Sequence, residues 1–577
     1  MFKKLFLAAT MMATCMQLNA QNVAPNYKVM SNNNPISPCV FCADPTALEY
    51  NGRLYVYGTN DHQQFIKNGK KNGNGYGDIK SIVVFSTDDM VNWTFHGTID
   101  VGKLCSSWGW RFAASWAPSV TWRTTEDGTE EFFLYFANSG GSVGVLKANS
   151  PIGPWISPLS KPMIDADTPG VRPCHWIFDP GVIIDENGTG WIAFGGGDPQ
   201  DKGTDLQPNN ARFAKLMPSM TAIDGQAVKI PAPYHFEASE LNIMDGKFVY
   251  TYCSSWAERK DADWNAYLAE HGINYPKPAS CTMCYMVNAD PMNPDTWTYK
   301  GVCGPHPGFP SPNNHSHLQK FQGNYYYFYH WGPLMKSMID ANAIDSSCDG
   351  YRSICVNLAT VSEETQNIKP VVQELSGVTE IRNMNPYQLQ EAETMANCGG
   401  VSYEDFTNIQ KNTRVSTLGN DASRNMQVQM RTGSWITQRR VDFGTTGAAK
   451  YMLRAKGTGT LEIRVGRIGA KAAGTVNISS TEMEDYTIEV DASKLQGVKN
   501  VFFVVTSADD LYVDAWQFTE AQNDGIQVIN SNENIKSHNY DISGRRLDEY
   551  QNKGIVIEQY TDEKGVKHSR KTLHKQQ

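Results

Sequence analysis

The run Ala43-Asp44-Pro45-Thr46-Ala47-Leu48 recurs in altered form four more times along the chain, each time ahead of a strand-like stretch. The later copies are residues 116–120 (WAPSV), 179–184 (DPGVII), 237–241 (EASEL) and 315–318 (HSHL). In four copies a Gly or Asn turn follows, and an aromatic-rich strand then begins 10–12 residues after the acid or histidine; the second copy has a longer insertion. A repeat of this kind predicts an architecture of similar units placed side by side.

The spacing of the five runs is typical of a β-propeller. Their distinctive residues are Asp44, Trp116, Asp179, Glu237 and His315. Successive ones are 72, 63, 58 and 78 residues apart, which is enough for a blade of four short strands with its loops. Helical periodicity is scarce, and residues 261–271 form the best helical candidate. We therefore expect an all-β chain that begins with a five-bladed β-propeller, whose innermost strands line a central channel.

The first twenty residues have the pattern of a secretory signal peptide. Lys3 and Lys4 supply the charged start, an apolar stretch follows, and small residues precede a cleavage point after Ala20. Lipid attachment at Cys15 is the alternative, although Thr14 before it fits that poorly. The sequence therefore predicts export, to the periplasm, the cell surface or the medium.

Three further segments follow the signal peptide. The propeller is expected over residues 21–380, with a linker at 369–384. Residues 385–520 hold short strands whose spacing suits a β-sandwich, with a jelly-roll-like arrangement. The polar residues 521–577 leave three readings open: a few strands, a sorting or anchoring segment, or a disordered tail.

Composition excludes some classes of function. The chain has 577 residues and a net charge of −9, which argues against a polyanionic partner such as nucleic acid. No stretch after the signal peptide is long and apolar enough to be a transmembrane segment. Eleven cysteines remain after cleavage, including the close pairs Cys39/Cys42 and Cys281/Cys284, without a second pair or histidines at zinc spacing. Disulfides, and the alternative of buried free thiols with one or two bridges, both remain open.

Three carboxylates are expected at one mouth of the propeller. A single Asp-Pro or Glu-Ala is ordinarily a turn starter, but Asp44, Asp179 and Glu237 occupy corresponding places in their repeats. Glycoside hydrolysis needs one carboxylic acid to protonate the leaving oxygen and one carboxylate to activate water or attack the sugar. A third acid nearby raises the pKa of the proton donor by like-charge repulsion. The longer side chain of Glu237 suits the donor.

The region 38–368 resembles glycoside hydrolase family 43, a family of five-bladed propellers. The matching pieces are residues 41–45 (FCADP), 115–120 (SWAPSV), 178–181 (FDPG), 236–239 (FEAS), 314–315 (NH) and 351–356 (YRSICV). The resemblance implies that Asp44 is the general base, Glu237 is the general acid, and Asp179 tunes the pKa of Glu237 and orients it. It also implies inversion of the anomeric configuration by a single displacement.

The same resemblance assigns three further residues to the sugar site. Trp116 matches an aromatic wall of the pocket, and Arg352 matches an arginine that contacts the substrate, with an ordinary salt bridge as its alternative. His315 matches a histidine near the floor, which in some members contacts a central calcium ion or its water shell; a core histidine is its alternative. The chain departs from the family at Ser316, where related sequences often carry another histidine.

Residues 385–519 resemble carbohydrate-binding module family 6. Glu391, Glu393 and Asp514 fall where that family holds a structural calcium ion, and hard carboxylate oxygens suit calcium. Calcium would therefore be structural in either module, and the chemistry itself would require no cofactor.

The resemblance also indicates the substrate class. Family members act mainly on arabinose- and xylose-containing plant polysaccharides, so arabinoxylan or xylan is the expected partner. We expect an exo-acting α-L-arabinofuranosidase or β-xylosidase. An endo-arabinanase and a non-catalytic propeller that binds sugar at a cell surface are the alternatives. A retaining enzyme similar to family 32 would carry its nucleophile in an Asn-Asp-Pro setting, where this chain has Ala43-Asp44-Pro45.

Overall fold

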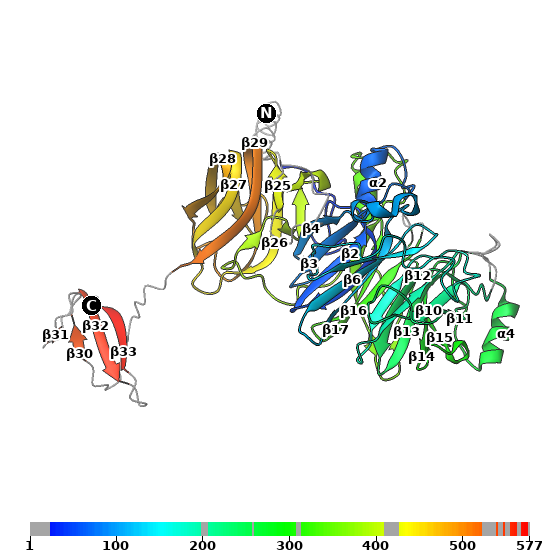
Figure 1. The fold of residues 1–577 in the computed structure, drawn as a ribbon. Helices are drawn as coiled ribbons and strands as arrows, with labels where there is room; N and C mark the ends of the chain where they lie inside the picture. Colours follow the sequence, from blue (N-terminus) through cyan, green and yellow to red (C-terminus); the bar gives the residue numbers. More distant parts are fainter. Residues whose placement is uncertain are drawn as a thin grey trace, which may run out of the picture.

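The structure is a computed structural model. It describes residues 23–197, 206–256, 259–306, 308, 313–408, 426–521 and four strands between 538 and 574. The predicted signal peptide lies outside the described residues. Figure 1 shows a propeller in blue to green and a curled sheet in yellow to orange, both built almost wholly from strands. The all-β fold class is confirmed.

Five antiparallel sheets form the propeller. Blade 1 contains β1 (Ala43–Tyr50), β2 (Arg53–Thr59), β3 (Ile82–Thr87) and β4 (Trp93–Ile99). Blade 2 contains β5 (Trp116–Thr124), β6 (Glu130–Ala137) and β7 (Val143–Ala148). Blade 3 contains β8 (Gly181–Ile184), β9 (Gly190–Phe194), β10 (Ala211–Lys215) and β11 (Val228–Ile230). Blade 4 contains β12 (His235–Met244), β13 (Lys247–Ser254), β14 (Met283–Asn288) and β15 (Thr298–Gly304), and blade 5 contains β16 (Ser316–Phe321), β17 (Asn324–Trp331) and β18 (Ser353–Ala359).

The first strand of each blade overlaps one of the five repeated runs. Strands β1, β5, β8, β12 and β16 contact one another in that order, and β1 also contacts β16, so the ring is closed. The segment before β1 adds to the edge of the last blade, because the backbone N–H of Ile36 donates to the carbonyl of Ile354 at 2.9 Å. The predicted five-bladed propeller is therefore confirmed.

Short helices and two minor strands lie in the loops of the propeller. They are α2 (Asp61–Asn68), α3 (Val101–Leu104), α4 (Asp261–His271), α5 (Pro333–Asp340), the 3-10 helices η1 (Ser106–Arg111) and η2 (Pro294–Thr296), and the hairpin of β19 (Val361–Ser362) and β20 (Asn367–Ile368). The helix predicted at 261–271 coincides with α4. None of the helices in the described part of the chain is both long and apolar enough to cross a bilayer.

The second module is one sheet that curls around its own core. Its strands are β21 (Gln390–Glu391), β23 (Asn397–Gly399), β24 (Phe406–Asn408), β25 (Met426–Met430), β26 (Trp435–Asp442), β27 (Ala448–Val465), β28 (Gly474–Glu489) and β29 (Val498–Glu520), with η3 (Tyr403–Asp405) before β24. The short strand β22 (Thr394–Met395) belongs instead to the sheet of blade 1. One edge of β29 pairs first with β26 and then with β25, while β27 pairs along the other edge. This sharing of long strands closes the sheet around Tyr451, Phe503 and Trp516, which are buried, and confirms the predicted sandwich-like module.

The two modules share a hydrophobic core at blade 1. Strand β22 pairs antiparallel with β4, with Thr394 opposite Thr94. The ring of Phe95 in blade 1 lies 4.9 Å from the ring of Phe406 in an edge-on arrangement. The buried ammonium group of Lys28 donates to the carbonyl of Ala396 at 2.9 Å. The second module is therefore packed onto the propeller rather than tethered by the linker alone.

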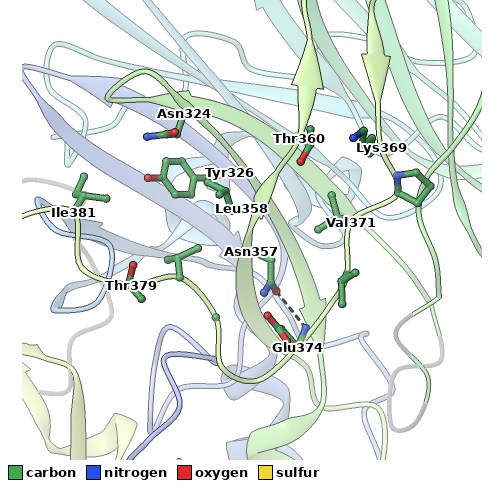
Figure 2. A pocket seen from close by; sticks show the side chains of 14 residues that line it. Asn324, Tyr326, Asn357, Leu358, Thr360, Lys369, Val371, Glu374, Thr379 and Ile381 are labelled. Carbon is green, nitrogen blue, oxygen red and sulfur yellow. Dashed lines mark hydrogen bonds between the residues drawn. The ribbon is translucent and has the colours of Figure 1, made fainter.

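The segment predicted as a linker, residues 369–384, runs along the propeller. The backbone N–H of Val371 donates to the carbonyl of Cys303 at 2.9 Å, and the N–H of Ile381 donates to the carbonyl of Asp89 at 3.1 Å. A cavity of about 540 Å³ lies between the linker and the outer strands of blade 5 (Figure 2). Glu374 is the single carboxylate in its lining, so the cavity is not the carboxylate site predicted at the channel mouth.

The tail contains a small antiparallel sheet. Its strands are β30 (His538–Tyr540), β31 (Arg546–Leu547), β32 (Gly554–Thr561) and β33 (Lys567–His574), in the order β31-β30-β32-β33. Of the three readings that the sequence left open for 521–577, the few strands agree with the structure.

Candidate active site

The inner strands begin with an unusual backbone conformation in four blades. Asp44, Ala117, Asp179 and Ala238 have φ of 48°, 39°, 46° and 63°, a region that residues other than glycine rarely adopt. At the same place, the first strands of blades 1, 2 and 4 contain a β-bulge, where their pairing with the second strand shifts in register. The bulges lie between Ala43 and Thr46, between Trp116 and Ser119, and between Glu237 and Glu240. Bulges of this kind redirect side chains and often lie beside active sites.

This conformation corrects one feature of the predicted site. Asp44 and Asp179 are themselves the residues with positive φ, whereas Glu237 precedes such a residue and corresponds to Trp116 in blade 2. The three carboxylates therefore do not occupy equivalent positions. Successive side chains of an extended chain point in different directions, so the predicted acid reaches the site from a different angle than the predicted base.

Asp44 is buried and held on both carboxylate oxygens. Its Oδ1 accepts a hydrogen bond from Nη1 of Arg352 at 2.9 Å, and its Oδ2 accepts one from the hydroxyl of Thr59 at 2.7 Å. Its backbone N–H donates to Nδ1 of His330 at 3.1 Å. Burial is the largest single influence and would raise the pKa of Asp44, but the charge of Arg352 and the contact with His330 together outweigh it and hold that pKa well below its usual value. Asp44 is therefore a carboxylate throughout the physiological range, as a general base requires.

Arg352 forms the salt bridge that the sequence left as an alternative to substrate contact. Its Nε and Nη2 donate to the two oxygens of Asp61, each at 2.9 Å, and its Nη1 donates to Asp44. The guanidinium carbon lies 5.0 Å from the ring centroid of Tyr76, in a cation–π arrangement. Arg352 is only 2% exposed, and its contacts position Asp44. Contact between Arg352 and a substrate stays a prediction.

Asp179 and Glu237 form a second pair, and the pKa of each is raised. Burial, and then the negative charge of Asp44, raise the pKa of Asp179 to about 7. Burial, followed by Asp179, raises the pKa of Glu237 well above its usual value. The backbone N–H of Ala238 donates to Oδ2 of Asp179 at 2.9 Å, which ties Asp179 to the chain beside Glu237. No described residue bonds to the buried Oε1 of Glu237, so this atom is available to a leaving oxygen.

These shifts predict how Asp179 controls the pH profile. In Asp179→Asn, the charge that helps to keep Glu237 protonated is lost, so the pKa of Glu237 falls. Because the general acid must be protonated, the alkaline limb of kcat/KM is expected to move to lower pH by about one unit. The measurement is kcat/KM from pH 4 to 9 for both proteins. An alkaline limb at the wild-type position would contradict the tuning role of Asp179.

The remaining predicted residues lie around the carboxylates. Nδ1 of His315 is 3.8 Å from Oδ1 of Asp44 and 4.0 Å from Oδ2 of Asp179. Burial lowers the pKa of His315 to about 3, so the ring is neutral. Trp116 is partly exposed and donates from its indole N–H to the carbonyl of Tyr76 at 3.1 Å, which fixes the ring at the rim as a wall would require.

Calcium stays a prediction in both modules. In the second module, Glu391 lies opposite Ala515 in the sheet, next to Asp514, but Oδ2 of Asp514 is 3.0 Å from Nε of Arg454. The backbone carbonyl of Glu393 accepts from the N–H of Phe95 at the module junction. Among the described residues, no three or more His, Cys, Asp or Glu side chains gather closely enough to hold a metal ion. In the propeller, the buried Nε2 of His315 has no hydrogen-bond partner among the described residues.

Sequence reasoning missed several residues of the site. Four residues outside the five runs contact the predicted base or its arginine. Thr59 and His330 are hydrogen-bonded to Asp44, and Asp61 and Tyr76 contact Arg352. The one signal in the sequence was the polar triplet Asn60-Asp61-His62 directly after the aromatic strand β2.

Two exposed tryptophans beside Glu237 were missed as well. The ring of Phe236 lies 5.6 Å from that of Trp176 and 4.5 Å from that of Trp256. Trp176 and Trp256 are 37% and 43% exposed, which is high for so large an apolar side chain. They provide an aromatic surface next to the predicted acid, on which sugar rings can stack.

The cysteines are free thiols, and nine of them are buried. All eleven cysteines from Cys39 to Cys398 lie among the described residues and are unbridged. Cys253 pairs with Glu237 across β12 and β13, and its sulfur is 3.6 Å from that of Cys281.

A buried carboxylate beside two buried carboxyl groups whose pKa is raised, at the mouth of a five-bladed propeller, defines a propeller glycosidase. The family described as glycosyl hydrolases family 43 matches residues 32–359, and the chain belongs to this family. A second family, carbohydrate binding module (family 6), matches residues 391–520. Membership sets aside the family 32 reading and the non-catalytic propeller.

The chain is similar along most of its length to known proteins. It is 35% identical over 515 residues to an arabinoxylan arabinofuranohydrolase of Bacillus subtilis, covering 85% of this chain and 93% of the relative. It is 34% identical to an arabinoxylan arabinofuranohydrolase of Paenibacillus polymyxa, covering 90% of this chain and 79% of the relative. Among solved structures, the family 43 arabinoxylan arabinofuranohydrolase of Bacillus subtilis, in complex with cellotetraose, matches with a TM-score of 0.74 and 34% identity, over 87% of this chain and all of that one.

Proposed function

We propose that this protein is an exo-acting α-L-arabinofuranosidase that removes arabinofuranose side groups from arabinoxylan. The observation that carries the proposal is the set of buried carboxyl groups with opposite pKa shifts, Asp44 lowered and Glu237 raised. The similarity to two arabinoxylan arabinofuranohydrolases, which extends over both modules, supports the choice of substrate. A polysaccharide partner is consistent with the second module and its match to a carbohydrate-binding family.

The proposed mechanism follows from the charge states. Asp44 is ionised and takes a proton from a water molecule, which attacks the anomeric carbon. Glu237 is protonated and gives its proton to the leaving oxygen as the glycosidic bond breaks. One C–O bond forms and one breaks in the same step, so the product sugar has the inverted anomeric configuration. Asp179 keeps Glu237 protonated, and Arg352 keeps Asp44 ionised and in place.

The proposal is tested by product analysis. Purified protein is incubated with arabinoxylan, linear arabinan, xylobiose, an aryl α-L-arabinofuranoside and an aryl β-xyloside. We expect free arabinose from arabinoxylan and from the aryl arabinofuranoside. Arabino-oligosaccharides from linear arabinan would instead support the endo-arabinanase alternative, and xylose from xylobiose would support a β-xylosidase. Inactivity on every substrate would refute the proposal.

The exposed tryptophans are expected to bind the xylan chain rather than the arabinose unit. Trp176→Ala and Trp256→Ala should each raise KM for arabinoxylan about fivefold, because a stacking contact with a sugar ring is lost. KM for the aryl arabinofuranoside, which has no xylan chain, should change less than about twofold. Leu358→Ala is a control, since Leu358 is 60% exposed beside the cavity at the linker. Equal effects on both substrates would contradict a role in binding the polymer.

Two expectations accompany this proposal. Arabinoxylan is an extracellular polymer, so its hydrolysis agrees with the export that residues 1–20 predict. Structural calcium stays a proposal as well, and a comparison of the melting temperature in calcium and in a chelator would test it.

A further inference from the structure

The second module touches the residues on both sides of Asp61. Helix α2 begins at Asp61, with Asn60 before it and His62 after it. The amide of Asn60 donates to the hydroxyl of Tyr403 at 3.1 Å. The ring of Tyr403 stacks on the ring of His62 with centroids 4.5 Å apart and an angle of 17°. Both flanking residues are thus in direct contact with η3 of the second module.

A charged contact adds to this stack. Oε2 of Glu404, the next residue of η3, lies 3.7 Å from Nε2 of His62. The contact with His62 overcomes burial and lowers the pKa of Glu404 to about 2, so Glu404 is a carboxylate. His62 is in turn bonded to the segment before β1: its N–H donates to the carbonyl of Phe41 at 3.1 Å, and its Nδ1 accepts from the N–H of Phe41 at 3.3 Å.

The residue between these two contacts holds the arginine of the active site. Asp61 is fully buried, and its two oxygens accept from Nε and Nη2 of Arg352, each at 2.9 Å. Arg352 then donates from Nη1 to Asp44. Tyr403 is therefore separated from the predicted general base by two ordered links, the start of α2 and the Asp61–Arg352 pair.

The contacting turn of the second module is itself rigid. Ser402 and Asp405 form a capping box around η3, with the N–H of Ser402 donating to Oδ2 of Asp405 at 2.8 Å. Oδ1 of Asp405 pairs with Arg431 at 2.7 Å. Tyr403 is 8% exposed and lies beside Phe95 of blade 1, within the core that the two modules share. A rigid, buried turn can fix the position of α2 in a way that a mobile appendage cannot.

We propose that Tyr403 and Glu404 of the second module are positioning residues for the hydrolytic reaction, which act through Asn60, His62 and the Asp61–Arg352 pair on Asp44. The inference rests on the proposed function, because it concerns the rate of that reaction. It gives the second module a part in catalysis that does not depend on binding sugar. It also explains why the interface of the modules is placed at the start of α2.

The test uses the full-length protein and separates kcat from KM. Tyr403→Ala removes both the stack and the hydroxyl contact, and it is expected to lower kcat on an aryl arabinofuranoside about tenfold. Tyr403→Phe keeps the stack and should retain most of the activity, and Glu404→Gln should lower kcat about threefold. KM should change less than about twofold in each variant, since none of these residues touches the substrate. The melting temperature of each variant shows that it is folded at the assay temperature.

A control and a double variant distinguish positioning from general destabilisation. Tyr387→Phe also removes a tyrosine hydroxyl contact, to the carbonyl of Phe443 inside the second module, and should leave kcat unchanged. Asp61→Asn breaks the link to Arg352, so Tyr403→Ala should have little further effect on kcat in that background.

Three results would overturn the inference. The first is a wild-type kcat in folded Tyr403→Ala. The second is a loss of kcat in Tyr387→Phe equal to the loss in Tyr403→Ala. The third is a double variant of Asp61→Asn and Tyr403→Ala in which the two losses of kcat multiply. Failure of the proposed function is a separate outcome, because the wild-type protein would then be inactive on the aryl arabinofuranoside.

Discussion

Glu237→Gln is expected to lower kcat on arabinoxylan about 1,000-fold, which is within the range that a general acid contributes. The glutamine amide has nearly the same shape as the protonated carboxyl group, but it cannot release a proton to the leaving oxygen. The xylan hydroxyl that leaves is a poor leaving group at neutral pH and needs that proton. The buried environment that raises the pKa of Glu237 also accepts a neutral amide, so the variant should fold.

The leaving group makes this prediction specific to an acid. A nitrophenol leaves readily without protonation, so the loss in Glu237→Gln should shrink to about tenfold on a nitrophenyl arabinofuranoside. The measurement is kcat on arabinoxylan and on aryl arabinofuranosides that differ in the acidity of the phenol. Glu363→Gln is the matched control, because Glu363 lies at the surface, where its pKa is lowered by its hydrogen bond to Lys320. An equal loss on all substrates would show that Glu237 is not the acid.

Local patterns made much of the fold predictable. Each blade has a run that combines a turn residue, a short apolar stretch and a second turn. These residues are close together in the sequence, so the pattern can be recognised without knowledge of distant contacts. Helix α4 was predicted for the same reason, since its signal lies within residues 261–271. The three carboxylates were found because each lies at, or one residue from, the same place in its repeat.

The parts that were missed depend on contacts between distant residues. Asp61 and Arg352 are 291 residues apart, and the sequence carries no local sign that they form a pair. The offset of Glu237 is visible in the pairing register: Glu237 pairs just before the slip in β12, as Ala43 does in β1, whereas Asp44 lies within the slip. The contact of Tyr403 with His62 likewise appears only when the two modules are packed together.

The general base is expected to show the largest effect of all. Asp44→Asn should lower kcat about 10,000-fold, at the upper end of what acid–base catalysis supplies, and the loss should be similar on arabinoxylan and on nitrophenyl arabinofuranoside. Water must be activated whatever group leaves, so an acidic leaving group cannot replace Asp44. This pattern is the opposite of the one expected for Glu237. Asp88→Asn serves as the control, because Asp88 is an exposed partner of Arg53.

The charge state of Asp44 adds a pH dependence to this prediction. Because Arg352 lowers its pKa, Asp44 stays ionised as the pH falls below the usual titration range of an aspartate near 3.9. The wild-type kcat/KM should therefore show no acid limb from the base between pH 4 and 6, and removing the charge of Arg352 in Arg352→Gln should raise the pKa of Asp44 and make such a limb appear. Proton NMR of the first sugar released completes the test. An inverted anomer agrees with water activation by Asp44, whereas a retained anomer would mean that Asp44 attacks the sugar itself.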